Sequence, residues 1–353
     1  MKGQFLSDLH VNIDKACPLW NGEIRMAEKR LLERVREALR VRHYSFATER
    51  VYVMWMRRFI LFHGKRHPAE MGKREVEAFL THLAVTRGVS PSTQNQALQA
   101  ILFLYLQVLE QELPWLDTVV RAKPKHRVPV VLSVEEVSQL LARLAPGQAL
   151  SVRLLYGSGL RVMECLRLRV GDLDFDRRTI RVYAGKGGKD RITILPDGLV
   201  NGLKHQMAHV ASVHHQDVRE GFGFAKLPHA LWRKFGASTQ DLHWQYVFPS
   251  SSRAEDPRAT GRWYRWHIHP DTVRKAVKKA ARDAGIRKRV TCHTLRHSFA
   301  THLLESGTDI RTIQALLGHK DVRTTMIYTH VVNRGVLGAL SPLDRLGRAI
   351  PGG

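Results

Sequence analysis

The chain has 353 residues, enough for two domains with hydrophobic cores of their own. Its 44% hydrophobic and 25% charged residues are ordinary for a globular protein, but 56 Lys and Arg against 32 Asp and Glu give a net charge of +24. Solubility alone does not require so large a positive surplus, which indicates a polyanionic partner such as nucleic acid.

The cysteines, histidines and first residues argue against several other classes of protein. Three cysteines, far apart, predict neither a disulfide framework nor a zinc site, and they suit a reducing cytoplasm. The first eight residues are too polar for a secretory signal, and no apolar run approaches membrane-spanning length. His205 and His209 have helical i,i+4 spacing, but without an evident third ligand a solvated helix face is favoured. We therefore expect a cytoplasmic protein that needs no metal or cofactor.

The N-terminal third is predicted to be helical. Residues 1–25 show no clear periodicity and are expected to form an arm. Over residues 26–113, apolar side chains recur at helical spacing in four segments. Ser45 and the pair Ser90-Pro91 are helix-start signals, because each supplies a capping hydroxyl. The pattern predicts a small bundle of four helices.

Residues 114–132 interrupt the helical periodicity with three prolines and several basic side chains. This composition predicts a linker between two domains. Its charge would suit a segment that crosses a phosphate backbone, although a solvated tether would have the same composition. The candidate DNA contacts in the linker are Arg121, Lys123, Lys125 and Arg127.

The second domain is expected over residues 133–353. Ser133 and Glu136 form a capping box, and helical periodicity then continues to about residue 168. Residues 179–183 and 191–194 alternate instead, which predicts a β-hairpin with a basic Gly-Lys-Gly-Gly-Lys tip, residues 185–189. The tip resembles a phosphate loop only superficially, because it joins two strands and lacks a Ser or Thr after the lysine. The predicted class is mainly α with a small antiparallel sheet, an α+β domain.

Residues from about 213 to 250 mix aromatic with basic side chains. Such a mixture can stack unpaired bases while it neutralises phosphate. For Trp244 and Phe248, a satellite hydrophobic core is the alternative interpretation. The mixed residues are Phe222, Phe224, Lys226, Trp232, Arg233, Lys234 and Trp244.

The C-terminal third holds a tyrosine accompanied by residues that suit phosphate. His293 and Arg296 share the first turn of a predicted helix, where the helix dipole favours an anion. A second predicted helix stops at Gly318; His319 follows it, and Tyr328 comes nine residues later.

A tyrosine attacks a phosphodiester effectively only when cations hold the phosphate and an acid assists the leaving oxygen. Arg161 and Lys186 lie upstream and would complete such a set. The residues therefore indicate DNA strand cleavage through a phosphotyrosine bond.

In this order the motifs resemble those of the tyrosine recombinases, and the match covers roughly residues 26–340. The shared motifs are Gly159-Leu160-Arg161, Lys186, His293 to Arg296, Leu317-Gly318-His319 and Tyr328. The resemblance implies a two-domain, C-shaped clamp on DNA and a homotetramer that exchanges strands through a Holliday junction without ATP or metal. Residues 331–353 would form an oligomerisation tail that docks on a neighbouring subunit.

The resemblance also implies a role for each motif residue. Arg161 and Arg296 would clamp the scissile phosphate, while His293 and His319 would hydrogen-bond it and assist proton transfer. Tyr328 would be the nucleophile that leaves a 3′-phosphotyrosine. Lys186 would protonate the leaving 5′ oxygen; Lys189, the other hairpin lysine, is a candidate for the same role and for DNA contact. Glu164 would orient the region around Arg161.

The aromatic segment is similar to the extra segment of integron integrases, with one departure: Phe235-Gly236 stands where that pattern has Tyr-Pro. This resemblance implies a recombinase that inserts and excises gene cassettes, acting on folded single-stranded cassette sites and a duplex integron site. Three alternatives stay open at this point. They are a phage-type or chromosomal recombinase for duplex sites, a type IB topoisomerase, and a non-catalytic architectural DNA-binding protein.

Overall fold

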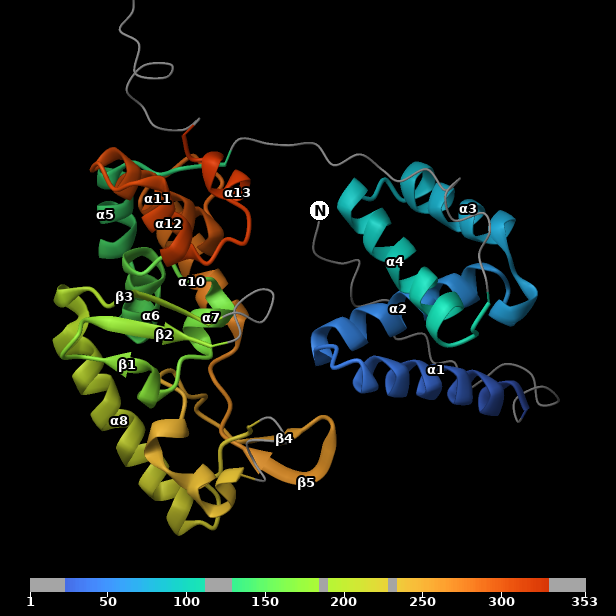
Figure 1. The fold of residues 1–353 in the computed structure, drawn as a ribbon, viewed down its shortest axis with the longest axis horizontal. Coiled ribbons are helices and arrows are strands. Elements are labelled where there is room, and N and C mark those ends of the chain that lie inside the picture. The colour runs from blue at the N-terminus through green and yellow to red at the C-terminus, as the bar shows by residue number, and fades with distance from the viewer. Residues whose placement is uncertain (1–22, 112–128, 184–189, 228–233, 330–353) are drawn as a thin grey trace, which may run out of the picture. The chain divides into compact units, whose positions relative to one another are not determined.

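The computed structural model describes residues 23–111, 129–183, 190–227 and 234–329, with the side chains of the first helix described from residue 31. The chain divides into two compact units, Met1–His126 and Arg127–Gly353, and each is described by itself (Figure 1). Several residues expected to contact DNA lie outside the described ranges: Arg121, Lys123, Lys125, Arg127, Lys186, Lys189, Trp232 and Arg233. The N-terminal arm and the tail over 331–353 do so as well.

The N-terminal unit contains the four predicted helices. They are α1 (Glu23–Val41), α2 (Phe46–Phe62), α3 (Lys73–Thr81) and α4 (Pro91–Gln107), with a 3-10 turn at Pro68–Glu70 and a π-helical turn at His82–Thr86. Both start signals are confirmed, because the Ser45 and Ser90 hydroxyls accept hydrogen bonds from the amides of Thr48 and Thr93. Buried Tyr105 of α4 donates its hydroxyl proton to the carbonyl of Met71 at 3.0 Å and thereby fastens α4 to the loop before α3.

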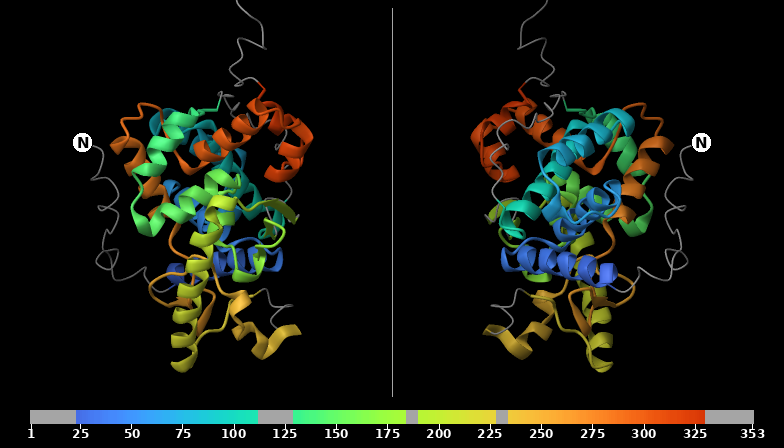
Figure 2. Two further views of the ribbon diagram at one scale, coloured as in Figure 1. Left: turned by 90° about the vertical axis from the view of Figure 1, so that its left-hand side faces the viewer. Right: turned by 90° about the vertical axis from the view of Figure 1, so that its right-hand side faces the viewer.

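The C-terminal unit is mainly helical with two small antiparallel sheets, as the fold class predicts. Its helices are α5 (Val134–Ala142), α6 (Pro146–Gly157), α7 (Val162–Leu166), α8 (Val200–Arg219), α10 (Pro270–Asp283), α11 (Cys292–Glu305), α12 (Ile310–Leu317) and α13 (Arg323–Met326). Its strands are β1 (Leu173–Asp174), β2 (Thr179–Val182), β3 (Arg191–Ile194), β4 (Ala254–Asp256) and β5 (Ala259–Tyr264). Helices α11 to α13 lie at one end of the unit and α8 reaches the other, with the first sheet between them (Figures 1 and 2).

The predicted hairpin is confirmed, since β2 pairs with β3 and places Ile180 opposite Thr193. Strand β1 adds a third, two-residue strand at the other edge of β2. The β4–β5 hairpin was not predicted from the sequence. Most residues of these two strands are exposed. Because neither strand has one buried face, its sequence does not alternate between polar and apolar side chains, which is the signal that predicts a strand.

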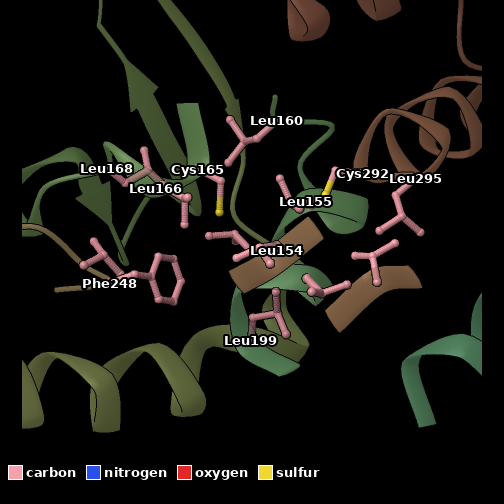
Figure 3. Close-up of a cluster of buried hydrophobic side chains, with 14 of the residues drawn as sticks. Leu154, Leu155, Leu160, Cys165, Leu166, Leu168, Leu199, Phe248, Cys292 and Leu295 are labelled. Carbon is pink, nitrogen blue, oxygen red and sulfur yellow. The ribbon is translucent and has the colours of Figure 1, made fainter. Parts of the chain in front are cut away.

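The core of the C-terminal unit forms around α6, with Leu154 and Leu155 at its centre (Figure 3). Phe248 joins this core at 6% exposure, so for that aromatic the core interpretation is confirmed. Cys165 and Cys292 are both buried and reduced. His205 and His209 are exposed on α8, as expected. In the part of the chain that the structure describes, no helix is long and apolar enough to cross a membrane.

Candidate active site

Arg296 lies at the centre of the candidate site, with its side chain 1% exposed. It extends from the first turns of α11, which Thr291 caps by accepting a hydrogen bond from the Thr294 amide. Its guanidinium donates to the carbonyl of Gly159 at 2.5 Å and to that of Leu317 at 2.6 Å. These bonds fix the charge between the turn after α6 and the end of α12. Burial, followed by repulsion from Arg161, lowers the pKa of Arg296 to about 9.

Glycine is required at position 159, where the backbone has a φ of +61° and a Cβ would lie 2.4 Å from the Phe299 ring. The turn can therefore pass close to α11 and present its carbonyl to Arg296. Arg161 follows at the N-terminus of α7, with its side chain 22% exposed.

Glu164 joins three arginines. Its carboxylate accepts hydrogen bonds from Arg161 at 2.6 Å and from both terminal nitrogens of Arg191 at 2.7 and 3.1 Å, and it lies 3.7 Å from Arg296. Burial acts to raise the pKa of Glu164, but hydrogen bonds from Arg191 and Arg161 outweigh it and lower the pKa to about 2. Arg191 comes from β3 and also donates to the Leu316 carbonyl at 2.9 Å. It thus ties the β2–β3 hairpin, at the strand pair nearest its connecting residues, to the end of α12.

His319 is aimed by the backbone, as the sequence predicts. Gly318 ends α12 in the left-handed conformation, with a φ of +65°. The Nε2 atom of His319 lies 3.2 Å from Arg296 Nη2, and its Nδ1 atom lies 2.9 Å from the Thr325 hydroxyl. Because the guanidinium can only donate, Nε2 accepts and the ring proton belongs on Nδ1. Burial, followed by the charges of Arg296 and Arg161, lowers the pKa of His319 to about 3. The ring is therefore neutral near pH 7.

Tyr328 lies in a turn after α13 and is 1% exposed. Its ring stacks on His319, with centroids 6.3 Å apart and planes 16° apart. Its hydroxyl lies 3.1 Å from Nδ1 of His297. Burial raises the pKa of Tyr328, whereas the charges of Arg296 and Arg161 act against that rise. The expected nucleophile is thus protonated and within the electric field of both arginines.

The structure brings together five of the residues that the sequence selected: Arg161, Glu164, Arg296, His319 and Tyr328. His293 is exposed on the same helix, with its ring 5.0 Å from that of His297. Lys186 lies outside the described residues, between β2 and β3 in the sequence.

Sequence reasoning missed Arg191, His297 and Thr325 as members of the site. An arginine on an alternating strand is usually solvated, so Arg191 gave no signal. His297 could have been found, because it stands four residues after His293, where a helix brings side chains together. Among the described residues, no group of three metal-ligating side chains lies close enough to hold an ion.

Two family profiles cover this architecture: "Phage integrase family" matches residues 131–334, and "Phage integrase, N-terminal SAM-like domain" matches residues 31–115. The "Integrase/recombinase" proteins of Escherichia coli and Pseudomonas aeruginosa are each 50% identical to the chain over 317 residues, covering 90% of it and 94% of each relative. The chain belongs to the phage integrase family. It is a site-specific tyrosine recombinase, an enzyme that cleaves and rejoins DNA.

Solved structures show the same fold at lower identity. XerH recombinase bound to palindromic difH has a TM-score of 0.53 at 20% identity, over 87% of this chain and 83% of that one. The Tn1549 transposon integrase in complex with transposon right end DNA has a TM-score of 0.54 at 16% identity, over 90% and 98% of the two chains. Both likenesses support the mainly helical fold of this chain.

The recombinase has a second group of paired charges beside its aromatic segment. Asp217, near the end of α8, is 4% exposed and binds Arg265 at 2.5 Å and Arg253 at 3.1 Å. Arg253 also covers the Phe222 ring, 4.0 Å from its centroid, and contacts Glu220 at 2.7 Å. These contacts fasten the β4–β5 hairpin to α8.

Two tryptophans in and just after this segment are partly exposed. Trp263 of β5 is 49% exposed, and Trp244 is half-buried with its ring 5.2 Å from that of Phe235. Lys234 is exposed and lies 5.4 Å from the Phe235 ring, as a solvent-facing cation would. Gly236 has a φ of +47°, which proline cannot adopt, so the departure from Tyr-Pro changes the local backbone.

Proposed function

We propose that this recombinase is an integron integrase in which Tyr328 cleaves DNA to leave a 3′-phosphotyrosine. The observation that carries the chemistry is the convergence of Tyr328, His319 and two arginines from four separate segments. Each of these side chains has a place in this chemistry: Tyr328 as the nucleophile, two fixed cations for the phosphate, and a neutral His319 ring whose Nε2 atom accepts from Arg296 and so helps to orient it.

The two arginines would hold the non-bridging oxygens of the scissile phosphate. A guanidinium carries five N–H groups, and in the described residues Arg296 directs three toward Gly159, Leu317 and His319. Further donors then remain for a phosphate, and they are held in place by bonds to backbone carbonyls. Arg161 is more open and would complete the clamp. Such preorganised charge stabilises the transition state more than the substrate.

In the proposed reaction the Tyr328 oxygen forms a bond to phosphorus while the bond to the 5′ oxygen breaks. Lys186 would give the leaving oxygen its proton. The phosphotyrosine retains the bond energy, so attack by the 5′ hydroxyl of another strand reseals DNA without ATP. Exchange of both strand pairs through a Holliday junction would require a homotetramer on two sites.

The proposed preference for cassette sites is argued from the side chains between Phe222 and Trp266. It places aromatic rings beside cations, as in the Arg253–Phe222 contact and in Lys226 at 5.3 Å from the Trp266 ring. Trp263, half-exposed on β5, offers a face for an unpaired base. We propose that these groups, with Trp232 and Arg233, read bases that protrude from a folded single strand.

A trapping assay tests both the phosphotyrosine chemistry and the integron assignment. Purified protein and its Tyr328→Phe variant are each mixed, without metal or ATP, with nicked suicide substrates made from a folded cassette site and from duplex sites. We expect a covalent adduct on the folded strand with the wild type and none with the variant. Adducts on duplex alone would reject the integron assignment but keep the chemistry, whereas no adduct on any substrate would favour an architectural protein.

A further inference from the structure

His297 is placed where a proton acceptor for the nucleophile would have to be. It follows Arg296 on α11, and its Nδ1 atom lies 3.1 Å from the Tyr328 hydroxyl. Among the described residues, this is the one hydrogen-bond partner of that hydroxyl. A general base must lie within hydrogen-bond reach of the proton that it removes, and this distance meets that requirement.

The surroundings of His297 keep its ring neutral. The groups that face it are His293 and Arg296 on its own helix, Tyr328 after α13 and His319 after α12. Burial, followed by His293 and the charge of Arg296, lowers the pKa of His297 to about 4. At neutral pH one ring nitrogen of His297 is therefore unprotonated and can accept a proton. If the Tyr328 hydroxyl donates to Nδ1, the ring proton resides on Nε2.

We propose that His297 is the general base of strand cleavage, and that its Nδ1 atom takes the hydroxyl proton of Tyr328 as the tyrosine oxygen attacks phosphorus. This inference rests on the proposed function of Tyr328 as the nucleophile. In the step, the Tyr328 O–H bond breaks and an N–H bond forms on His297; the tyrosine oxygen–phosphorus bond forms and the bond to the 5′ oxygen breaks. The leaving oxygen receives a different proton, from Lys186. On resealing, His297 returns its proton to Tyr328.

Binding of DNA makes this transfer easier. The charges that disfavour a protonated His297 in the free protein include that of Arg296, which is neutralised when a scissile phosphate occupies the site. The basicity of His297 therefore rises once the substrate is present. A base that gains strength on substrate binding also leaves Tyr328 protonated and unreactive in the absence of DNA.

His293 is not equivalent to His297 in this respect. It is exposed, and it sits one helical turn earlier with its ring centroid 5.0 Å from that of His297. It suits a hydrogen bond to phosphate, as the resemblance implies, whereas His297 contacts the reacting oxygen of Tyr328 directly. The two histidines of the His-x-x-Arg-His motif thus have separate tasks, one toward the phosphate and one toward the nucleophile.

The test is single-turnover cleavage by His297→Asn, compared on an ordinary suicide substrate and on one whose leaving 5′ oxygen is replaced by sulfur. Asn retains a polar group near Tyr328 but cannot accept a proton. We expect a loss of about 10²- to 10⁴-fold on both substrates. Lys186→Ala should also lose activity on the oxygen substrate, but it should regain it on sulfur, because a thiolate leaves without a proton. The rate of His297→Asn should rise with pH, as the tyrosine ionises without a base.

Two controls separate chemistry from folding. His302→Asn makes the same change on the same helix, where His302 contacts the Tyr156 hydroxyl and the Leu132 carbonyl and not the Tyr328 hydroxyl. It should keep the wild-type pH profile and the wild-type response to sulfur. Thermal unfolding and DNA binding are measured for each variant, and His297→Gln replaces His297→Asn if the latter unfolds at the assay temperature.

The outcomes distinguish this inference from the function on which it rests. Wild-type adduct formation together with a His297 variant within about threefold of wild type overturns the inference alone. Rescue of the variant by sulfur also overturns it, since His297 would then act on the leaving group. If the wild type forms no adduct on any substrate, the proposed function fails and the inference fails with it.

Discussion

The active site and the aromatic segment both bury charged groups, but they balance charge differently. Around Glu164, one carboxylate faces three arginines, Arg161, Arg191 and Arg296. Around Asp217, the charges are matched: Arg253, Arg265 and Lys226 pair with Asp217, Glu220 and Asp256. The first group retains a surplus of two positive charges, and the second has none.

The surplus has a physical meaning. Like charges in a buried site repel each other, which is one reason that the pKa of Arg296 is lowered. Under the proposed function, an incoming phosphate would relieve that repulsion and complete the cluster. The balanced group around Asp217 needs no anion and serves to hold its hairpin in shape. Under the proposed function, recognition there would fall to exposed aromatic rings, chiefly Trp263.

The largest effect on cleavage should come from a substitution that keeps the positive charge of Arg296 but removes the planar guanidinium. In Arg296→Lys the cation remains, but one ammonium cannot reach Gly159, Leu317 and a phosphate together. We expect single-turnover cleavage to fall by about 10³-fold or more, with DNA binding nearly unchanged. Arg282→Lys, exposed on α10, is the matched control and should behave as wild type. Near-normal cleavage by Arg296→Lys would mean that charge alone suffices.

Removing the one carboxylate should affect stability. Glu164→Gln leaves three arginines without their counter-ion, and we expect the free energy of unfolding at pH 7 to fall by about 3 to 5 kcal/mol. Chemical denaturation measures this, with Glu77→Gln as a control, since Glu77 forms an exposed pair with Lys73 at 3.9 Å. An equal effect at the two positions would contradict the importance of the cluster.

The same variant predicts a pH dependence. The pKa of Glu164 is lowered in the folded protein to about 2, from an ordinary value of 4.5. Its contribution is therefore fully present above pH 4.5 and is lost as the pH falls toward 2. The stability difference between wild type and Glu164→Gln should shrink over that interval.

The smallest effect is expected beside the balanced group, at the exposed ring of Trp263. Trp263→Ala removes an exposed ring from β5 without touching the Asp217 ion pairs. We expect binding to a folded single strand with unpaired bases to weaken by about 1 to 3 kcal/mol, with duplex binding unchanged. Fluorescence anisotropy at fixed salt measures both. Thr260→Ala, exposed on the same strand, should alter neither. A parallel loss on duplex would assign Trp263 to general DNA contact.

Local sequence predicted the positions of some residues of the site but not of others. The positions of Arg296 at the start of α11, of Gly318 at the end of α12 and of His319 after it follow from capping residues and helical periodicity. Arg191 is different, because the same alternating pattern would suit a solvated strand residue. Its burial at 7% exposure depends on α12, which lies more than a hundred residues later in the chain.

The sequence by itself determined the class of chemistry, the order of the helices and the β2–β3 hairpin, and it selected Tyr328 as the expected nucleophile, because these depend on residue type and on short-range spacing. The tertiary structure decided which groups meet: Glu164 with three arginines, His297 with the Tyr328 hydroxyl, and the β4–β5 hairpin with Asp217. Contacts across long sequence separations depend on how the core brings α6, α7, α11 and α12 together, and no local period records that packing.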